Sequence, residues 1–185
     1  ALSSADLAAV GPVAVAVAAL VDLAAEAEVL EAAGQDRVGK IMRTKDFIEK
    51  LEHDRIAKAI AGAEATTSGE IRVFVQHGDV ADPIGEARQQ FERLGMTQTR
   101  ERNGVLIFVA PRAQKFAVIG DKGVHERCGD PFWQTLTQAM RTYFQAQNFT
   151  DAVVHAIRET GHLLAQHFPP RPDDRNELPN TVLEG

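Results

Sequence analysis

The stretch from Asn103 to Gly123 constrains the fold of this 185-residue chain more than any other part. Residues 105–110 are apolar without a break and rich in β-branched and aromatic side chains, which is typical of a strand covered on both faces. After a loop of four residues, residues 115–119 resume with β-favouring side chains. Because the loop is so short, we expect the two strands to be antiparallel neighbours.

The segments before this stretch alternate between helical and strand patterns. Apolar residues at helical spacing predict one helix that Thr44 caps and that the Thr66–Gly69 segment ends. Alternation over residues 70–76 predicts a strand. Asp82-Pro83 predicts the capped start of a second helix, and Gly95 its end.

Two more helices are predicted after the central stretch, one opened by Asp130-Pro131 and one capped by Thr150. The order is therefore helix, strand, helix, strand, strand, helix, helix. The strand–helix–strand unit should be a right-handed crossover that makes the first two strands parallel. This order predicts an α/β fold, a three-layer α/β/α sandwich around a small mixed sheet.

The two ends of the chain differ from its centre. Residues 1–41 are Ala-rich and predict an extra N-terminal helix, whereas residues 169–185 form a Pro-rich acidic tail expected to lack regular structure. Net charges are −4 for residues 1–41, zero for 42–168 and −2 for 169–185. We therefore expect a helical extension, one α/β/α domain over residues 42–168, and a tail.

Composition argues against several classes of protein. A neutral centre with acidic ends lacks the clustered Lys and Arg of a nucleic-acid surface. No segment reaches the roughly 20 apolar residues of a membrane helix, and no signal peptide is evident, so membrane insertion is not expected. The single cysteine, Cys128, allows no intrachain disulfide and suits a reducing compartment, which favours a cytoplasmic location.

The predicted topology brings polar residues to one edge of the sheet. Glu70 and Asn103 stand where the two parallel strands begin, and the antiparallel strand returns Asp121 to the same edge. Carboxylate and amide oxygens suit a hard cation such as Ca²⁺ or Mg²⁺. Arg100 and Arg102, in the loop just before, could hold an anion such as phosphate.

The same residues also have a purely structural interpretation. Asn103-Gly104 is a common turn pair, and Gly-Asp-Lys-Gly is typical of a chain reversal. Glu70 could simply pair with Arg100 or Arg102. The sequence leaves both alternatives open, and it contains no HExxH, CxxC, Walker or GxSxG motif.

Three segments resemble the TPM domain family: Ser68–Val73 (SGEIRV), Arg102–Ile107 (RNGVLI) and Ile119–Gly123 (IGDKG). The resemblance covers about residues 42–168. It implies an α/β/α sandwich, divalent-metal binding in some members, acid phosphatase activity in some, and roles in assembling or repairing membrane complexes in others.

The chain departs from the common family pattern in two ways. We expect neither a signal peptide nor a membrane anchor, and Asp121 stands where many relatives have a glycine or an aromatic residue. It is therefore most similar to the short soluble bacterial branch of the family.

Two functions follow as hypotheses. The first is a soluble, non-catalytic binding or assembly module that binds an unidentified protein partner and could also bind a divalent metal. The alternative is a divalent-metal-dependent acid phosphatase, a phosphomonoesterase. In that case Glu70, Asn103 and Asp121 hold the cation, and Arg100 or Arg102 neutralises the developing charge.

Overall fold

The computed structural model describes residues 43–171 and 181–185. Its helices are α1 (Thr44–Glu49), α2 (His53–Glu64), α3 (Pro83–Arg93), the short 3-10 helix η2 (Met96–Gln98), α4 (Lys122–Gln145) and α5 (Phe149–His167). Its strands are β1 (Glu70–Val75), β2 (Gly104–Ala110), β3 (Lys115–Gly120) and β4 (Val182–Glu184). The helix expected within residues 1–41 lies outside the described residues.

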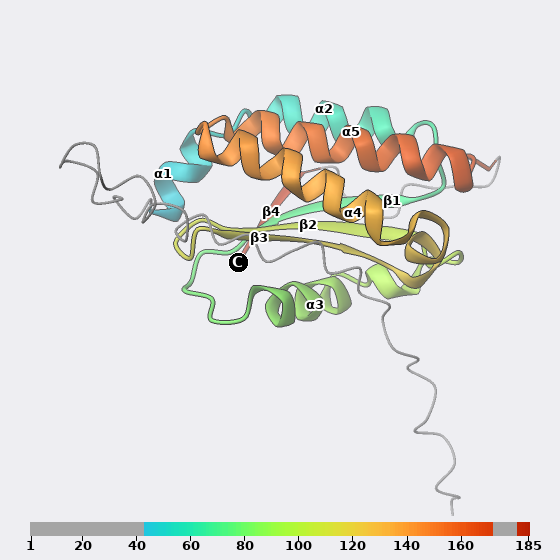
Figure 1. Ribbon diagram of the computed structural model, residues 1–185, viewed down its shortest axis with the longest axis horizontal. Coiled ribbons are helices and arrows are strands. Elements are labelled where there is room, and N and C mark those ends of the chain that lie inside the picture. Colours follow the sequence, from blue (N-terminus) through green and yellow to red (C-terminus); the bar gives the residue numbers. More distant parts are fainter. Residues whose placement is uncertain (1–42, 172–180) are drawn as a thin grey trace, which may run out of the picture.

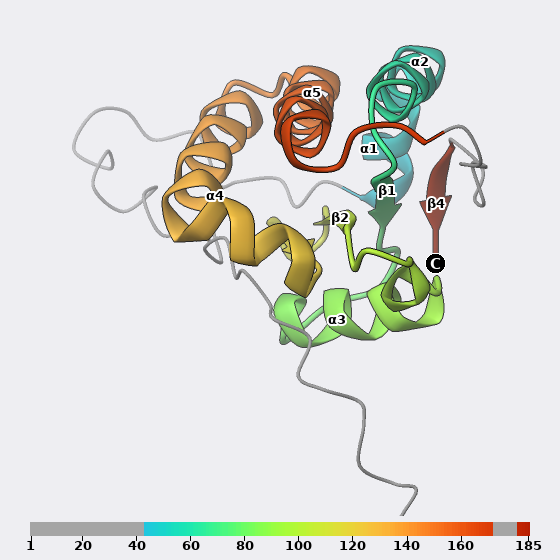
Figure 2. The same ribbon diagram turned by 90° about the vertical axis from the view of Figure 1, so that its right-hand side faces the viewer.

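Helices cover both faces of a mixed sheet, so the predicted three-layer α/β/α sandwich is confirmed. Figure 1 shows α2, α4 and α5 on one side of the strands and α3 on the other. Figure 2, turned by 90°, shows α4, α5 and α2 following one another in an arc above the sheet.

The strand order is β3-β2-β1-β4. Strands β1 and β2 are parallel, with Ile71 opposite Val105, which confirms the predicted crossover. Strands β2 and β3 are antiparallel, with Ile107 opposite Val118, which confirms the predicted hairpin. Helix α3 and η2 form the connection between β1 and β2.

The fourth strand corrects the expectation of a tail without regular structure. Strand β4 pairs in parallel with β1, from Val73 opposite Val182 to Val75 opposite Glu184. Without it, β1 would present an unpaired row of N–H and C=O groups at the edge of the sheet. Leu183 also packs against the α3-side core, so the end of the chain contributes to the fold.

Alternation along the strands divides the core in two. Side chains such as Val73, Ile107 and Val118 belong to the larger cluster, together with residues of α2, α4 and α5. Their neighbours Phe74 and Phe108 point to the other face and pack with Phe91 of α3. Because both faces are covered, β1 and β2 are buried along their whole length, as expected for strands inside a sandwich.

The sequence located α3 correctly. The side chain of Asp82 accepts hydrogen bonds from the backbone N–H groups of Ile84 (3.2 Å) and Gly85 (3.0 Å). Pro83 occupies the first turn, where its missing N–H has no cost. Just after the helix, Gly95 adopts a left-handed conformation at φ 68°, which favours glycine.

The first predicted helix is instead two helices. Residues 50–52, between α1 and α2, are not helical. The apolar side chains keep a helical spacing across this segment, although the backbone is not helical there. Thr44 is not a cap, because its hydroxyl donates to the carbonyl of His77 at 3.2 Å. Thr150 is likewise not the cap of α5, since its hydroxyl accepts from the N–H of Glu52 at 3.1 Å.

Helix α4 begins earlier than Asp130-Pro131. It starts at Lys122 with Asp121 as its N-cap, and it bends at Gly129, where φ is 64° and ψ is 179°. The predicted start was therefore the point where the helix resumes after this kink. Pro131 fits there because it has no N–H to leave unpaired on the far side of the bend.

Candidate functional site

The predicted sheet edge is formed. Glu70 is the register partner of Gly104 at the start of the parallel pair. The N–H of Asp121 donates to the carbonyl of Gly104 at 2.9 Å, so the end of β3 returns to the same edge. The topology thus brings Glu70, Gly104 and Asp121 to one row, with Arg102 and Asn103 immediately before Gly104.

Asp121 is bound on both carboxylate oxygens. Arg102 donates from Nε to Oδ2 at 2.7 Å and from Nη2 to Oδ1 at 2.9 Å. The N–H of Lys122 donates to Oδ1 at 2.7 Å, so the same carboxylate caps α4. The Asp121 side chain is fully buried, and its hydrogen bond to Arg102 raises the pKa of the guanidinium. This is a bidentate, charge-assisted pair.

The backbone of this loop is tightly fixed around that pair. Arg102 has a φ of 53°, in the left-handed region that non-glycine residues rarely adopt. The N–H of Gly123 donates to the carbonyl of Arg102 at 2.9 Å. A Cβ at Gly123 would lie 2.7 Å from that carbonyl oxygen, so only glycine allows this close approach.

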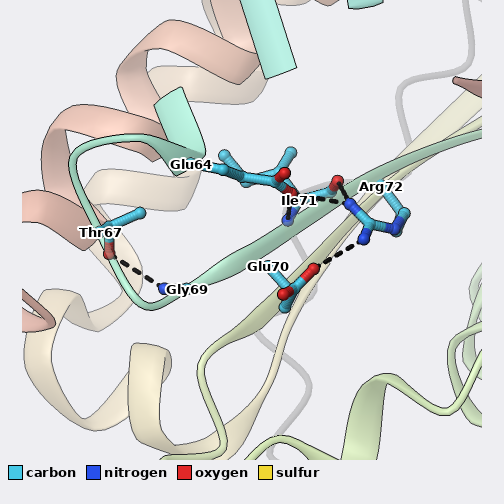
Figure 3. A network of polar contacts seen from close by, with 6 residues as sticks. All are labelled: Glu64, Thr67, Gly69, Glu70, Ile71 and Arg72. Carbon is cyan, nitrogen blue, oxygen red and sulfur yellow. Dashed lines mark hydrogen bonds and ion pairs between the residues drawn. The ribbon is translucent and has the colours of Figure 1, made fainter. Parts of the chain in front are cut away.

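Glu70 belongs to a second charge cluster, drawn in Figure 3, which centres on the fully buried guanidinium of Arg72. Arg72 donates to Glu70 and to Glu64, both at 2.7 Å. The N–H of Ile71 also donates to Glu64, at 3.0 Å. The sequence suggested Arg100 or Arg102 as the partner of Glu70, but its partner is Arg72, on the same strand. Through Glu64, the same cluster also connects the end of α2 to β1.

Asn103 and the two arginines have different surroundings. Asn103 is buried, and its Nδ2 donates to the carbonyl of Ser68 at 3.0 Å. Arg102 faces Asp121, whereas Arg100 is exposed in the loop after η2. The structure therefore brings Arg102 and Asp121 into contact and gives Glu70 and Asn103 partners elsewhere on the edge.

The donor atoms at this edge are used within the protein. A divalent cation at Asp121 would have to displace the Arg102 guanidinium, and at Glu70 it would compete with Arg72. Across residues 43–171 and 181–185, no three or more His, Cys, Asp or Glu side chains form a group that could hold a metal. In this arrangement the edge lacks an open coordination sphere, and Ca²⁺ or Mg²⁺ binding stays a prediction.

Cys128 lies near the kink of α4. Burial raises the pKa of its thiol to about 11. A thiol with so high a pKa is mostly protonated at neutral pH and is a weak nucleophile. Cys128 is therefore poorly suited to nucleophilic attack.

Sequence reasoning missed a groove on the outer side of the helical layer. It has a volume of about 1010 Å³ and lies between α2 and α5, which stand side by side in Figure 2. It is lined by Glu52, His53, Asp54, Arg55, Lys58, Ala59, Gly62, Ala63, Thr66, Arg158, Gly161 and His162. The available signal was the glycine within each helical pattern, because glycine is unfavourable inside a helix unless packing requires it.

Comparison with known proteins gives the family. The family model described as "TPM domain" matches residues 41–163. The chain belongs to the TPM domain family. A solved relative is the BA42 protein of the psychrophilic bacterium Bizionia argentinensis, whose NMR structure has a TM-score of 0.67 and 36% sequence identity. The match covers 80% of this chain and 98% of BA42, so it includes nearly all of that TPM-like protein.

A search of the curated proteins gave no match. Among the described residues of this TPM domain protein, no helix has the length and apolar character needed to cross a membrane.

Proposed function

We propose that this TPM domain protein is a non-catalytic binding or assembly module. The observation that carries the proposal is the use of the edge carboxylates. Asp121 caps α4 and holds Arg102, and Glu70 contributes to the buried cluster around Arg72. Residues in these roles stabilise the fold. The α2–α5 groove, by contrast, is rimmed by exposed charged side chains such as Lys58 and Arg158, which a partner could reach.

A cytoplasmic location is part of the proposal. Its support is the chain's single cysteine, because a lone thiol is compatible with a reducing compartment.

Affinity capture with the full chain, followed by mass spectrometry, tests this function. We expect a reproducible partner that forms a stoichiometric complex with the purified protein in light scattering. Screening the same preparation against panels of substrates tests whether the protein is an enzyme instead. Turnover of a substrate without any reproducible partner would overturn the proposal.

The second candidate is a phosphomonoesterase, favoured by the matching family model, whose name describes a TPM phosphatase. Hydrolysis of an aryl phosphate, measured with and without a chelator, is the direct assay. If the sheet edge is a metal-dependent active site, both the chelator and Asp121→Asn should abolish the rate. Activity that survives both treatments would exclude the edge as the site of hydrolysis.

A further inference from the structure

We propose that the groove between α2 and α5 binds an acidic amphipathic helix of a partner protein. The inference rests on the proposed function as a binding module and names the class of partner and its place. It follows from the shape of the groove, from its charges and from its lining, which comes from α2, α5 and the residues that flank α2.

The groove lies between two helices that run in the same direction. Arg55 pairs with Asp151 near the start of both helices, and Ala63 faces Gly161 further along both. The lining includes residues along the whole of α2, whose 12 residues correspond to about 18 Å of helix. A partner helix of three to four turns matches this length.

Small residues let such a helix approach closely. Ala59, Gly62, Ala63 and Gly161 contribute no bulky side chain to the lining. A Cβ built on Gly62 meets no atom within 4 Å, so the groove is open above this position. Gly62 is exposed, and so are Thr66 and His162 in the same lining. Grooves of this kind accept one face of an amphipathic helix.

The charges favour an acidic partner. Arg55 is neutralised by Glu52 and Asp151, at 3.2 Å and 2.5 Å. Lys58 and Arg158 are exposed, and within residues 43–171 and 181–185 the structure shows no ion pair for either.

The acids of the lining, Glu52 and Asp54, are confined to the start of α2, so the remaining length presents cations. Lys58 and Arg158 both lie on this part of the lining. Carboxylates on a partner would complement this surface and exclude basic partners.

A helix fits better than an extended peptide. The backbone groups of α2 and α5 are bonded within their own helices, so the groove offers side chains rather than a ladder of N–H and C=O groups. An extended peptide would leave its own backbone groups unpaired against this floor. A helix satisfies them internally and presents only side chains.

A synthetic helical peptide of about 16 residues is the probe, since that length spans the groove. One face carries Ala and Leu and the flanking positions carry Glu; a matched peptide carries Lys in place of Glu. We expect the acidic peptide, added to the full ¹⁵N-labelled chain, to shift the amide signals of Ala59, Gly62 and Gly161. The basic peptide should leave these signals in place.

Two pairs of substitutions give a matched control. Lys58→Glu with Arg158→Glu should weaken the acidic peptide about tenfold or more in fluorescence anisotropy. Arg88→Glu with Arg93→Glu makes the same charge change on α3, across the sheet, and should leave the affinity nearly unchanged. Gly62→Leu should block binding, because the leucine side chain would fill the groove. Unaltered melting temperatures would show that each variant keeps its fold.

Several results would overturn the proposal: equal binding of both peptides, signal shifts confined to another surface, or the same shifts produced by inorganic phosphate alone. The last result would identify a small-anion site instead. If a partner captured from extract binds the groove variants as well as the original chain, the proposed function stands and the groove is not where the partner binds. Failure of the proposed function itself would appear as substrate turnover without a partner.

Discussion

At the scale of single residues, Asp121 joins three parts of the molecule: the end of β3, the start of α4 and the loop that precedes β2. We expect Asp121→Asn to destabilise the fold by about 1–2 kcal/mol, because asparagine can still cap the helix but loses the charge-assisted pair with Arg102. Thermal melting measures this. Asp82→Asn, at the exposed cap of α3, is the matched control and should have almost no effect. An unchanged melting temperature for Asp121→Asn would indicate a residue held for function instead.

The Arg72 cluster gives a second prediction at this scale. Arg72→Met should lower the free energy of unfolding by about 3–5 kcal/mol in chemical denaturation. The substitution removes the cation that pairs with the buried carboxylates of Glu64 and Glu70. The triple variant that also carries Glu64→Gln and Glu70→Gln should recover much of this loss, because no buried charge then lacks compensation. A triple variant less stable than Arg72→Met alone would contradict this account of the cluster.

Cys128 gives a pH-dependent prediction. Burial raises the pKa of its thiol from 9.0 to about 11, so the folded protein holds this proton more tightly than the unfolded chain does. Stability should therefore fall as the pH rises between about 9 and about 11. Iodoacetamide should label the folded protein slowly at pH 8 and faster toward pH 11, whereas the denatured chain should react readily near pH 9. Equal labelling of both at pH 8 would refute the shift.

At the scale of elements, two glycines of the α2–α5 pair have opposite roles. A Cβ on Gly161 would lie 2.6 Å from the Cβ of Ala63, so Gly161→Ala should force the helices apart and cost about 1–3 kcal/mol. A Cβ on Gly62 meets nothing, so Gly62→Ala should stabilise α2 by up to about 1 kcal/mol. Thermal melting of the two variants side by side tests both, and equal effects would mean that the helices are not in this contact.

At the scale of the whole molecule, the sheet depends on its outermost strand. Removing residues 181–185 should lower the melting temperature and promote self-association, because the edge of β1 and part of Phe74 would become exposed. Light scattering during chromatography measures the association. Glu184→Gln keeps the strand and removes only its exposed ion pair with His77, so it should associate no more than the unmodified chain does. Identical behaviour of both variants would show that β4 is dispensable.

The layers of the fold could be predicted because they depend on local patterns. The hairpin of β2 and β3 follows from two apolar runs with a short loop, and α3 follows from Asp82 and Gly95. Strand β4 could not be predicted in the same way. Three residues after a Pro-rich segment have no recognisable period, and their pairing is decided by an available strand edge far away in the sequence.

The candidate site shows the same division. Topology predicted correctly that Glu70 and Asp121 come to one edge of the sheet. Side-chain pairing was not predictable, because it depends on which side chains the fold buries and on the position of Glu64 at the end of α2. Arg72, between Ile71 and Val73, looked like an ordinary polar residue of an alternating strand. Arg72 is the buried centre of a charge cluster because both faces of the sheet are covered, so that every residue of β1 is buried.

The position of β4 also has a consequence for the order in which the protein assembles. Val73 and Val182, which face each other in the sheet, are more than a hundred positions apart. A newly made chain can form the β2–β3 hairpin before β4 has been synthesised, and during that interval the outer edge of β1 has no β4 to pair with. Long-range parallel pairing is slow because the loop must close before its contacts form. Docking of β4 should therefore be a late event, and the interval before it the stage most prone to aggregation.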